Sequence, residues 1–106
     1  DAARRLLEKD PDITAIFCMS DVMAIGAIRY LKNIGRSVPD DISIIGYDGI
    51  SLADYYCPRL TTIKQLDNDL AKIGLGTILD AIEKKAPSKH QLIPFEFIEG
   101  ESVKQL

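Results

Sequence analysis

Residues 15–27 read AIFCMSDVMAIGA, and this stretch decides the fold. An apolar run stops at the polar pair Ser20-Asp21, and a helical pattern of apolar residues begins there. Runs rich in β-branched and aromatic residues are typical of strands, and serine and aspartate are typical first residues of helices. The stretch therefore predicts a strand that passes directly into a helix, as the elements of α/β folds do.

A second stretch repeats this pattern about one crossover later. Residues 38–49 read VPDDISIIGYDG, with an almost continuously apolar run, Ile42–Tyr47, followed by Asp48. Such a run suits a strand that is covered on both faces of a parallel sheet. Two successive strands thus end beside an acidic residue, and open α/β sheets bind small ligands at the carboxyl ends of their strands. The pattern indicates ligand binding rather than catalysis.

The remaining elements complete an α/β alternation. We expect strands at 13–18, 42–47, 61–63 and 92–98, helices at 21–34 and 67–85, and one helical turn that a weak capping motif opens at 51–54. Gly35 stands where a left-handed residue would end the first of these helices, and Pro94 places the last strand at an edge or a bend. The order predicts a parallel twisted sheet with too few strands for a complete doubly wound domain.

Composition narrows the classes of function. The net charge of −3 leaves no basic footprint for nucleic acid, and no apolar run approaches the length that spans a bilayer. Cys18, Cys57 and His90 have no zinc-ligand spacing, and there is no plausible Ser-His-Asp set and no glycine-rich phosphate loop. We therefore expect no metal, no cofactor and no catalytic residues. Residues 2–9 have a helical pattern that is entered midway, so we expect a piece of a longer protein.

Three blocks make the chain resemble the C-terminal part of the lactose/galactose repressor (LacI/GalR) family. They are residues 15–27, residues 38–48, and PRLTTIKQ at residues 58–65. The resemblance covers essentially the whole chain, and the tail from Gln91 onward is its least distinctive part. It implies a periplasmic-binding-protein-like fold of type I, in which two α/β lobes close on a sugar or another small effector. It also implies a cytoplasmic regulator whose N-terminal headpiece, absent here, binds operator DNA.

The resemblance also implies how the chain is divided between the lobes. Residues 1–65 would belong to the C-terminal lobe and residues 66–98 to the N-terminal lobe, and residues 99–106 would return toward the C-terminal lobe. The chain would then hold most of one lobe, together with one helix and one strand of the other. A half-domain of this kind exposes sheet edges, so we expect an intertwined or tightly packed homodimer.

The resemblance assigns effector binding to Asp48, Ser20 and Asp21. The carboxylate of Asp48 can accept charge-assisted hydrogen bonds from sugar hydroxyls, although Asp48 also suits a plain turn. Ser20 stands where the family often has asparagine, and Asp21 is expected to be mainly a helix cap, a role that either residue can fill. Gly49 departs from the acidic or amide residue that is common in the repressors and occurs in periplasmic sugar receptors.

A second surface resembles the family's dimer interface. It consists of Ile25, Ile28 and Arg29 on the first long helix, with Tyr55 and Tyr56 from the following loop. Paired tyrosines suit an interface, and a helix that is apolar around much of its circumference needs cover on more than one side. The alternative is that Ile25 and Ile28 only pack on the sheet.

Three classes of function remain to be compared. The first is the effector-sensing region of a repressor, in which effector binding favours the closed lobes and the dimer passes that bias to DNA. The second is a periplasmic sugar receptor of a transporter, which shares the fold. The third is a receiver-like phosphoacceptor that uses Asp48 with Lys64. That chemistry needs further acidic residues for a metal, and only Asp21 is placed to help, so the sequence disfavours it.

Overall fold

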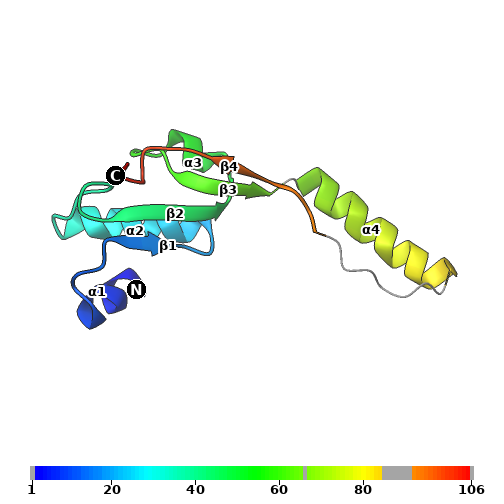
Figure 1. The fold of residues 1–106 in the computed structure, drawn as a ribbon, viewed down its shortest axis with the longest axis horizontal. Helices are drawn as coiled ribbons and strands as arrows, with labels where there is room; N and C mark the ends of the chain where they lie inside the picture. The colour runs from blue at the N-terminus through cyan, green and yellow to red at the C-terminus, as the bar shows by residue number, and fades with distance from the viewer. Residues whose placement is uncertain (1, 66, 85–91, 106) are drawn as a thin grey trace. The chain divides into compact units, whose positions relative to one another are not determined.

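The computed structural model describes residues 2–65, 67–84 and 92–105. In chain order its elements are α1 (Ala2–Lys9), β1 (Ala15–Phe17), α2 (Asp21–Asn33), β2 (Ser43–Asp48), α3 (Leu52–Tyr55), β3 (Thr61–Gln65), α4 (Asp67–Lys84) and β4 (Phe95–Ile98) (Figure 1). These residues form two compact units, Asp1–Lys64 with Phe97–Leu106 and Gln65–Glu96. The predicted α/β alternation is confirmed. The predicted end of α4 at residue 85 and the residues His90 and Gln91 lie outside the described part.

The strands form one sheet in the order β1-β2-β3-β4. The pairs β1–β2 and β2–β3 are parallel, with Ile16 opposite Ile44 and Gly46 opposite Thr62. The carboxyl ends of these three strands therefore lie at the same edge of the sheet (Figure 1). The last strand stands at the edge of the order, which confirms the position predicted from Pro94. Its predicted start at Leu92 is wrong, because the strand begins only after the proline, at Phe95.

Local signals set the ends of α2. The hydroxyl of Ser20 accepts a hydrogen bond from the Met23 amide at 3.2 Å, which satisfies a backbone donor of the first turn. Gly35 follows the helix at a φ of 77°, as predicted for a left-handed ending. The predicted cap at Ser51 is wrong. Its backbone has helical angles (φ −57°, ψ −27°) and its side chain makes no capping bond, whereas a capping residue needs an extended backbone.

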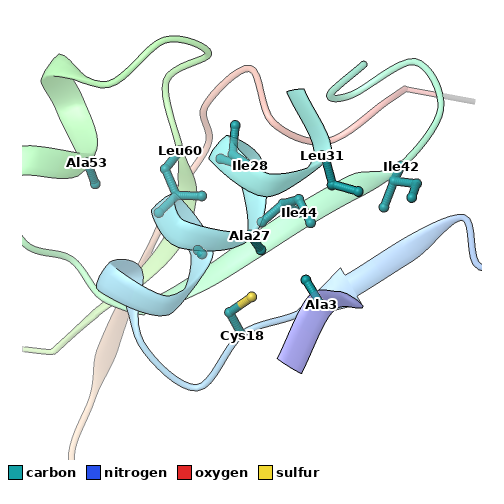
Figure 2. Close-up of a cluster of buried hydrophobic side chains, with 10 residues drawn as sticks. Ala3, Cys18, Ala27, Ile28, Leu31, Ile42, Ile44, Ala53 and Leu60 are labelled. Carbon is teal, nitrogen blue, oxygen red and sulfur yellow. The ribbon is translucent and has the colours of Figure 1, made fainter. Parts of the chain in front are cut away.

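A single hydrophobic cluster joins α1, α2, α3 and the sheet (Figure 2). Its buried members are Ala3, Cys18, Ala24, Ala27, Ile28, Leu31, Ile42, Ile44, Ala53 and Leu60. Leu31 and Ile44 are wholly shielded from water, and their burial is the main favourable contribution of such side chains to folding. Burial also raises the pKa of the Cys18 thiol, in keeping with its predicted role as a small buried hydrophobe.

Only one face of β2 is fully covered by the described residues. Ile44 and Gly46 are buried, whereas Ile45 and Tyr47, which alternate with them, are half-buried. Alternate residues of a strand point to opposite faces, and the buried pair faces the cluster that contains α2. The predicted cover on both faces is therefore met only in part.

The C-terminal segment, residues 99–105, is tied to β2 and β3 by hydrogen bonds. Ser102 is fully buried; its hydroxyl donates to the Ile44 carbonyl at 2.6 Å and accepts from the Thr61 amide at 2.8 Å. The Ile44 amide in turn donates to the Ser102 carbonyl at 2.7 Å. The segment thus satisfies strand groups that lie before the β2–β3 register begins at Ile45 and Thr61.

A turn between α2 and β2 is held by hydrogen bonds to a side chain. The backbone amide and the hydroxyl of Ser37 both donate to one carboxylate oxygen of Asp41, at 2.7 and 2.8 Å. These bonds favour the charged carboxylate, so the Ser37 amide, and then its hydroxyl, lower the pKa of Asp41 below the ordinary 3.8.

Candidate functional site

The carboxyl edge of the parallel strands carries the predicted ligand contacts. Asp48 is the last residue of β2 and lies opposite Lys64 of β3 in the parallel register. Ser20 follows the neighbouring strand β1 at the same edge and begins α2. Both Ser20 and Asp48 are half-buried, so each keeps part of its surface open to solvent. The edge therefore combines a hydroxyl and a carboxylate beside a lysine, which is a polar set suited to a hydroxylated ligand.

The backbone of Asp48 distinguishes it from an ordinary strand residue. Its φ is 116°, and it is the one non-glycine residue of the described ranges with a positive φ. Conformations of this kind cost about 1–3 kcal/mol and persist where the surrounding structure imposes them, often at ligand clamps. The sequence marked Asp48 by its position after a strand, but no local signal indicated this conformation.

Gly49 continues the unusual backbone and lies directly against β3. Its φ is 72°, and a Cβ atom built on it would come within 2.5 Å of both Cβ and Cγ of Lys64. The same Cβ would lie 2.6 Å from the Lys64 Cα atom, which cannot swing aside as a side-chain end can. A side chain at position 49 would therefore require the backbone of β3 at Lys64 to shift.

Asp21 has a different place from the one predicted. It is 0% exposed; one carboxylate oxygen accepts from the Ile50 amide at 2.8 Å and the other from the Thr62 hydroxyl at 2.5 Å. The prediction that Asp21 is mainly the helix cap is wrong, because the hydroxyl of Ser20 makes that bond. Asp21 is also closed to solvent, since both of its oxygens are bonded within the protein.

Gly46 is required by the position of Asp21. A Cβ atom at residue 46 would overlap the Asp21 carboxylate and lie 2.8 Å from the Leu60 Cδ2 atom. A glycine inside a strand often marks such a close approach, and this signal was available in the sequence but was not used. Gly46, Ile50 and Thr62 are thus the residues around Asp21 that the sequence analysis missed.

Only some of the residues predicted for the dimer interface are exposed. Ile28 is 3% exposed and belongs to the core, so its assignment to an interface is wrong and the alternative, packing on the sheet, holds for it. It follows Ala24 by four residues on the inward side of α2, and such pairs share one face of a helix. Tyr56 packs partly against the same core, Tyr55 is 84% exposed, and Arg29 is also exposed.

A more apolar surface lies between α1, β1 and the start of α2. It is a groove of about 420 Å³ whose lining includes Leu6, Phe17, Met19 and Met23. Phe17 is 59% exposed and Met19 77%, although the sequence placed Phe17 inside a buried strand and Met19 directly after it. The composition of β1 indicated burial, but the described residues do not provide it.

Two other features bear on the classes of function. No group of three or more His, Cys, Asp or Glu side chains within residues 2–65, 67–84 and 92–105 is arranged to hold a metal ion. None of the helices described in these ranges has both the length and the apolar character needed to cross a membrane.

The matches to known proteins cover nearly the whole chain. The family model of the periplasmic binding protein-like domain matches residues 1–103. The HTH-type transcriptional regulator MalR of Clostridium butyricum is 41% identical over 98 residues, which are 92% of this chain and 29% of MalR. The chain thus spans less than a third of that relative.

Solved structures agree with the sequence relatives. The complex of the transcriptional regulator CelR with cellobiose has a TM-score of 0.84 at 30% identity, over 95% of this chain and 31% of CelR. The Lac repressor dimer bound to operator and the anti-inducer ONPF has a TM-score of 0.85 at 30% identity, over 96% of this chain and 36% of that one. The chain therefore belongs to the periplasmic binding protein-like domain family, in the form that transcriptional regulators of the LacI/GalR type carry.

Proposed function

We propose that this chain is part of the effector-sensing region of a transcriptional repressor and that its effector is a sugar. The observation that carries the proposal is the strained backbone of Asp48 at the carboxyl edge of the sheet. A carboxylate held there can accept two hydrogen bonds from neighbouring sugar hydroxyls, and the hydroxyl of Ser20 can add one more. The cellobiose complex of CelR supports a sugar as the class of effector.

In this proposal the effector acts by shifting a population of conformations. Residues 1–65 and 99–106 belong to one lobe and residues 66–98 to the other, and the bound sugar favours the closed arrangement. A second copy of the protein receives that bias through exposed residues of α2 and α3, among them Arg29 and Tyr55, with the half-buried Ile25 at the margin. Operator DNA is bound by a headpiece outside this chain, and no chemical step is involved. The Lac repressor dimer on its operator supports this arrangement.

The other candidate, a sugar receptor of a transporter, has less support. MalR, CelR and the Lac repressor are regulators by their names, and they match at 30–41% identity along nearly all of this chain. The test is operator binding by the full-length protein. A repressor changes its affinity for operator DNA when the sugar is added, and a transport receptor does not.

Thermal shift on the full-length gene product tests the site. Cellobiose and a panel of other mono- and disaccharides are added to the wild type, to Asp48→Ala and to the control Asp54→Ala. Asp54 is an exposed aspartate on α3, so the control makes the same change of charge nearby. A ligand at 100 times its Kd stabilises by about 2.7 kcal/mol, which is readily measured. We expect Asp48→Ala to lose the sugar response and Asp54→Ala to keep it, and equal responses in the two variants would contradict the assignment.

A further inference from the structure

We propose that Asp21 is a positioning residue of the sugar site, which acts on Asp48 by holding the backbone of Ile50. The inference rests on the proposed function, because it takes Asp48 as the ligand contact. The sequence suggested two roles for Asp21, effector binding and helix capping. The proposed role differs from both, since this side chain neither caps the helix nor reaches solvent.

The first step of the argument is how the loop after β2 is fixed. At one end, Asp48 is paired with Lys64 in the β2–β3 register. At the other end, the Ile50 amide donates to the Asp21 carboxylate at 2.8 Å. Between these points lies Gly49 at a φ of 72°, and Asp48 itself has a φ of 116°. A strained two-residue bridge keeps its conformation only while both ends are held, and Asp21 holds the second end.

The second step is that Asp21 itself is rigidly placed. It lies in the first turn of α2, which begins at the β1 edge, and the Thr62 hydroxyl from β3 donates to its other oxygen at 2.5 Å. Gly46 of β2 approaches so closely that a methyl group there would overlap the carboxylate. One buried side chain at the start of α2 thus bonds to the beginning of β3 and to the loop that follows Asp48, and it packs closely against β2.

The third step is chemical. The Ile50 amide needs an acceptor at this place, and a methyl group provides none. Asparagine is different, because its carbonyl can accept from Ile50 while its amide donates to the oxygen of Thr62. If Asp21 acts by position, Asp21→Asn keeps the anchor and Asp21→Ala loses it. If Asp21 acts by its charge, both variants lose the function.

The experiment is calorimetric titration of the full-length protein with cellobiose, or with the panel sugar that gives the largest thermal shift. We expect Asp21→Ala to weaken binding by at least about tenfold, and Asp21→Asn to stay within about threefold of the wild type. The matched control is Asp12→Ala, which removes an exposed carboxylate between α1 and β1. We expect its affinity to stay within about threefold of the wild type, because Asp12 takes no part in the hydrogen bonds of Asp21.

A double variant separates the inference from the proposed function. In an Asp48→Ala background, Asp21→Ala should add less than about threefold, because the contact it positions is already gone. A full tenfold effect in that background, or wild-type affinity in Asp21→Ala alone, would overturn the inference and leave Asp48 as the ligand contact. If Asp48→Ala binds like the wild type, the proposed site and the inference both fall. If Asp21→Ala does not fold, Asp21→Asn decides, and a tenfold loss in that folded variant overturns the inference.

Discussion

The variant Asp48→Gly should be more stable than Asp48→Ala, although glycine is usually less stable than alanine inside a strand. Asp48→Ala and Asp48→Gly both remove the carboxylate and every interaction that it makes, so these losses cancel in the comparison. The variants differ in the Cβ atom. At a φ of 116° a Cβ atom is strained, whereas glycine adopts such angles without a steric penalty. Asp48→Gly should therefore be the more stable of the two.

The size of the difference follows from two opposing contributions. Relief of the backbone conformation favours glycine by about 1–3 kcal/mol. The greater freedom of glycine in the unfolded chain favours alanine by about 0.5–1 kcal/mol. The balance favours Asp48→Gly by about 1 kcal/mol. Both variants should bind sugar more weakly than the wild type, so the gain in stability would come with a loss of function.

Urea unfolding of the full-length variants measures this difference as a shift in midpoint at constant slope. Ser43 provides the control, since it lies in the same strand without a positive φ and is also half-buried. Both of its substitutions lose the bond from the Lys104 amide to the hydroxyl, so they too differ only in the Cβ atom. There Ser43→Ala should be the more stable by about 0.5–1 kcal/mol. The strain argument is refuted if alanine is the more stable residue at both positions.

Two further predictions concern stability alone. Gly46→Ala should destabilise the protein by about 1–3 kcal/mol, because its methyl group has no space beside Asp21. The control is Gly26→Ala in α2, where nothing lies within 4 Å of the added methyl group, and it should stabilise the protein by about 0.5–1 kcal/mol. This steric account is contradicted if denaturant unfolding shows that both substitutions change the stability in the same direction. The pKa of Asp41 is lowered in the folded state, so its contribution is present above pH 3.8 and is lost as the pH falls through the folded value. The Tm of Asp41→Asn should therefore lie below that of the wild type near neutral pH and approach it in stronger acid, and a constant gap would contradict this.

Much of the fold was predictable because its signals are local. The hydroxyl of Ser20 and the left-handed Gly35 mark the two ends of α2 within a residue or two of the expected places. Such signals depend on a few neighbouring residues, so a sequence shows them directly. The network around Asp21 is different, because its partners Ile50 and Thr62 lie 29 and 41 residues away along the chain. Only the parallel register brings them together.

The error at Ile28 has a related cause. The helix α2 has apolar residues around much of its circumference, and the sequence alone did not show which of them face the sheet. In the structure the small residues Ala24 and Ala27 lie inward with Ile28 and Leu31, which leaves Val22 and Met23 exposed. The rotation of the helix about its axis is set by packing against β2, and the apolar pattern therefore fixed the breadth of the apolar surface without fixing its direction.

Some apolar residues of β1 and β2 remain exposed, although the sequence predicted that both strands are buried. β2 has the continuous apolar pattern of a strand covered on both faces, but Ile45 is only half-buried, and Phe17 of β1 is 59% exposed. The chain spans 29% of MalR, and clusters of exposed apolar residues are typical of surfaces that contact another segment or another protein. The hydrogen bonds that place Ser20 and Asp21 lie by contrast within residues 20–62. The position of Asp21 is therefore set by contacts within this unit, although its partners lie far apart along the chain. Substitutions at Asp21 and Asp48 should accordingly change ligand affinity through contacts and backbone angles that this unit contains.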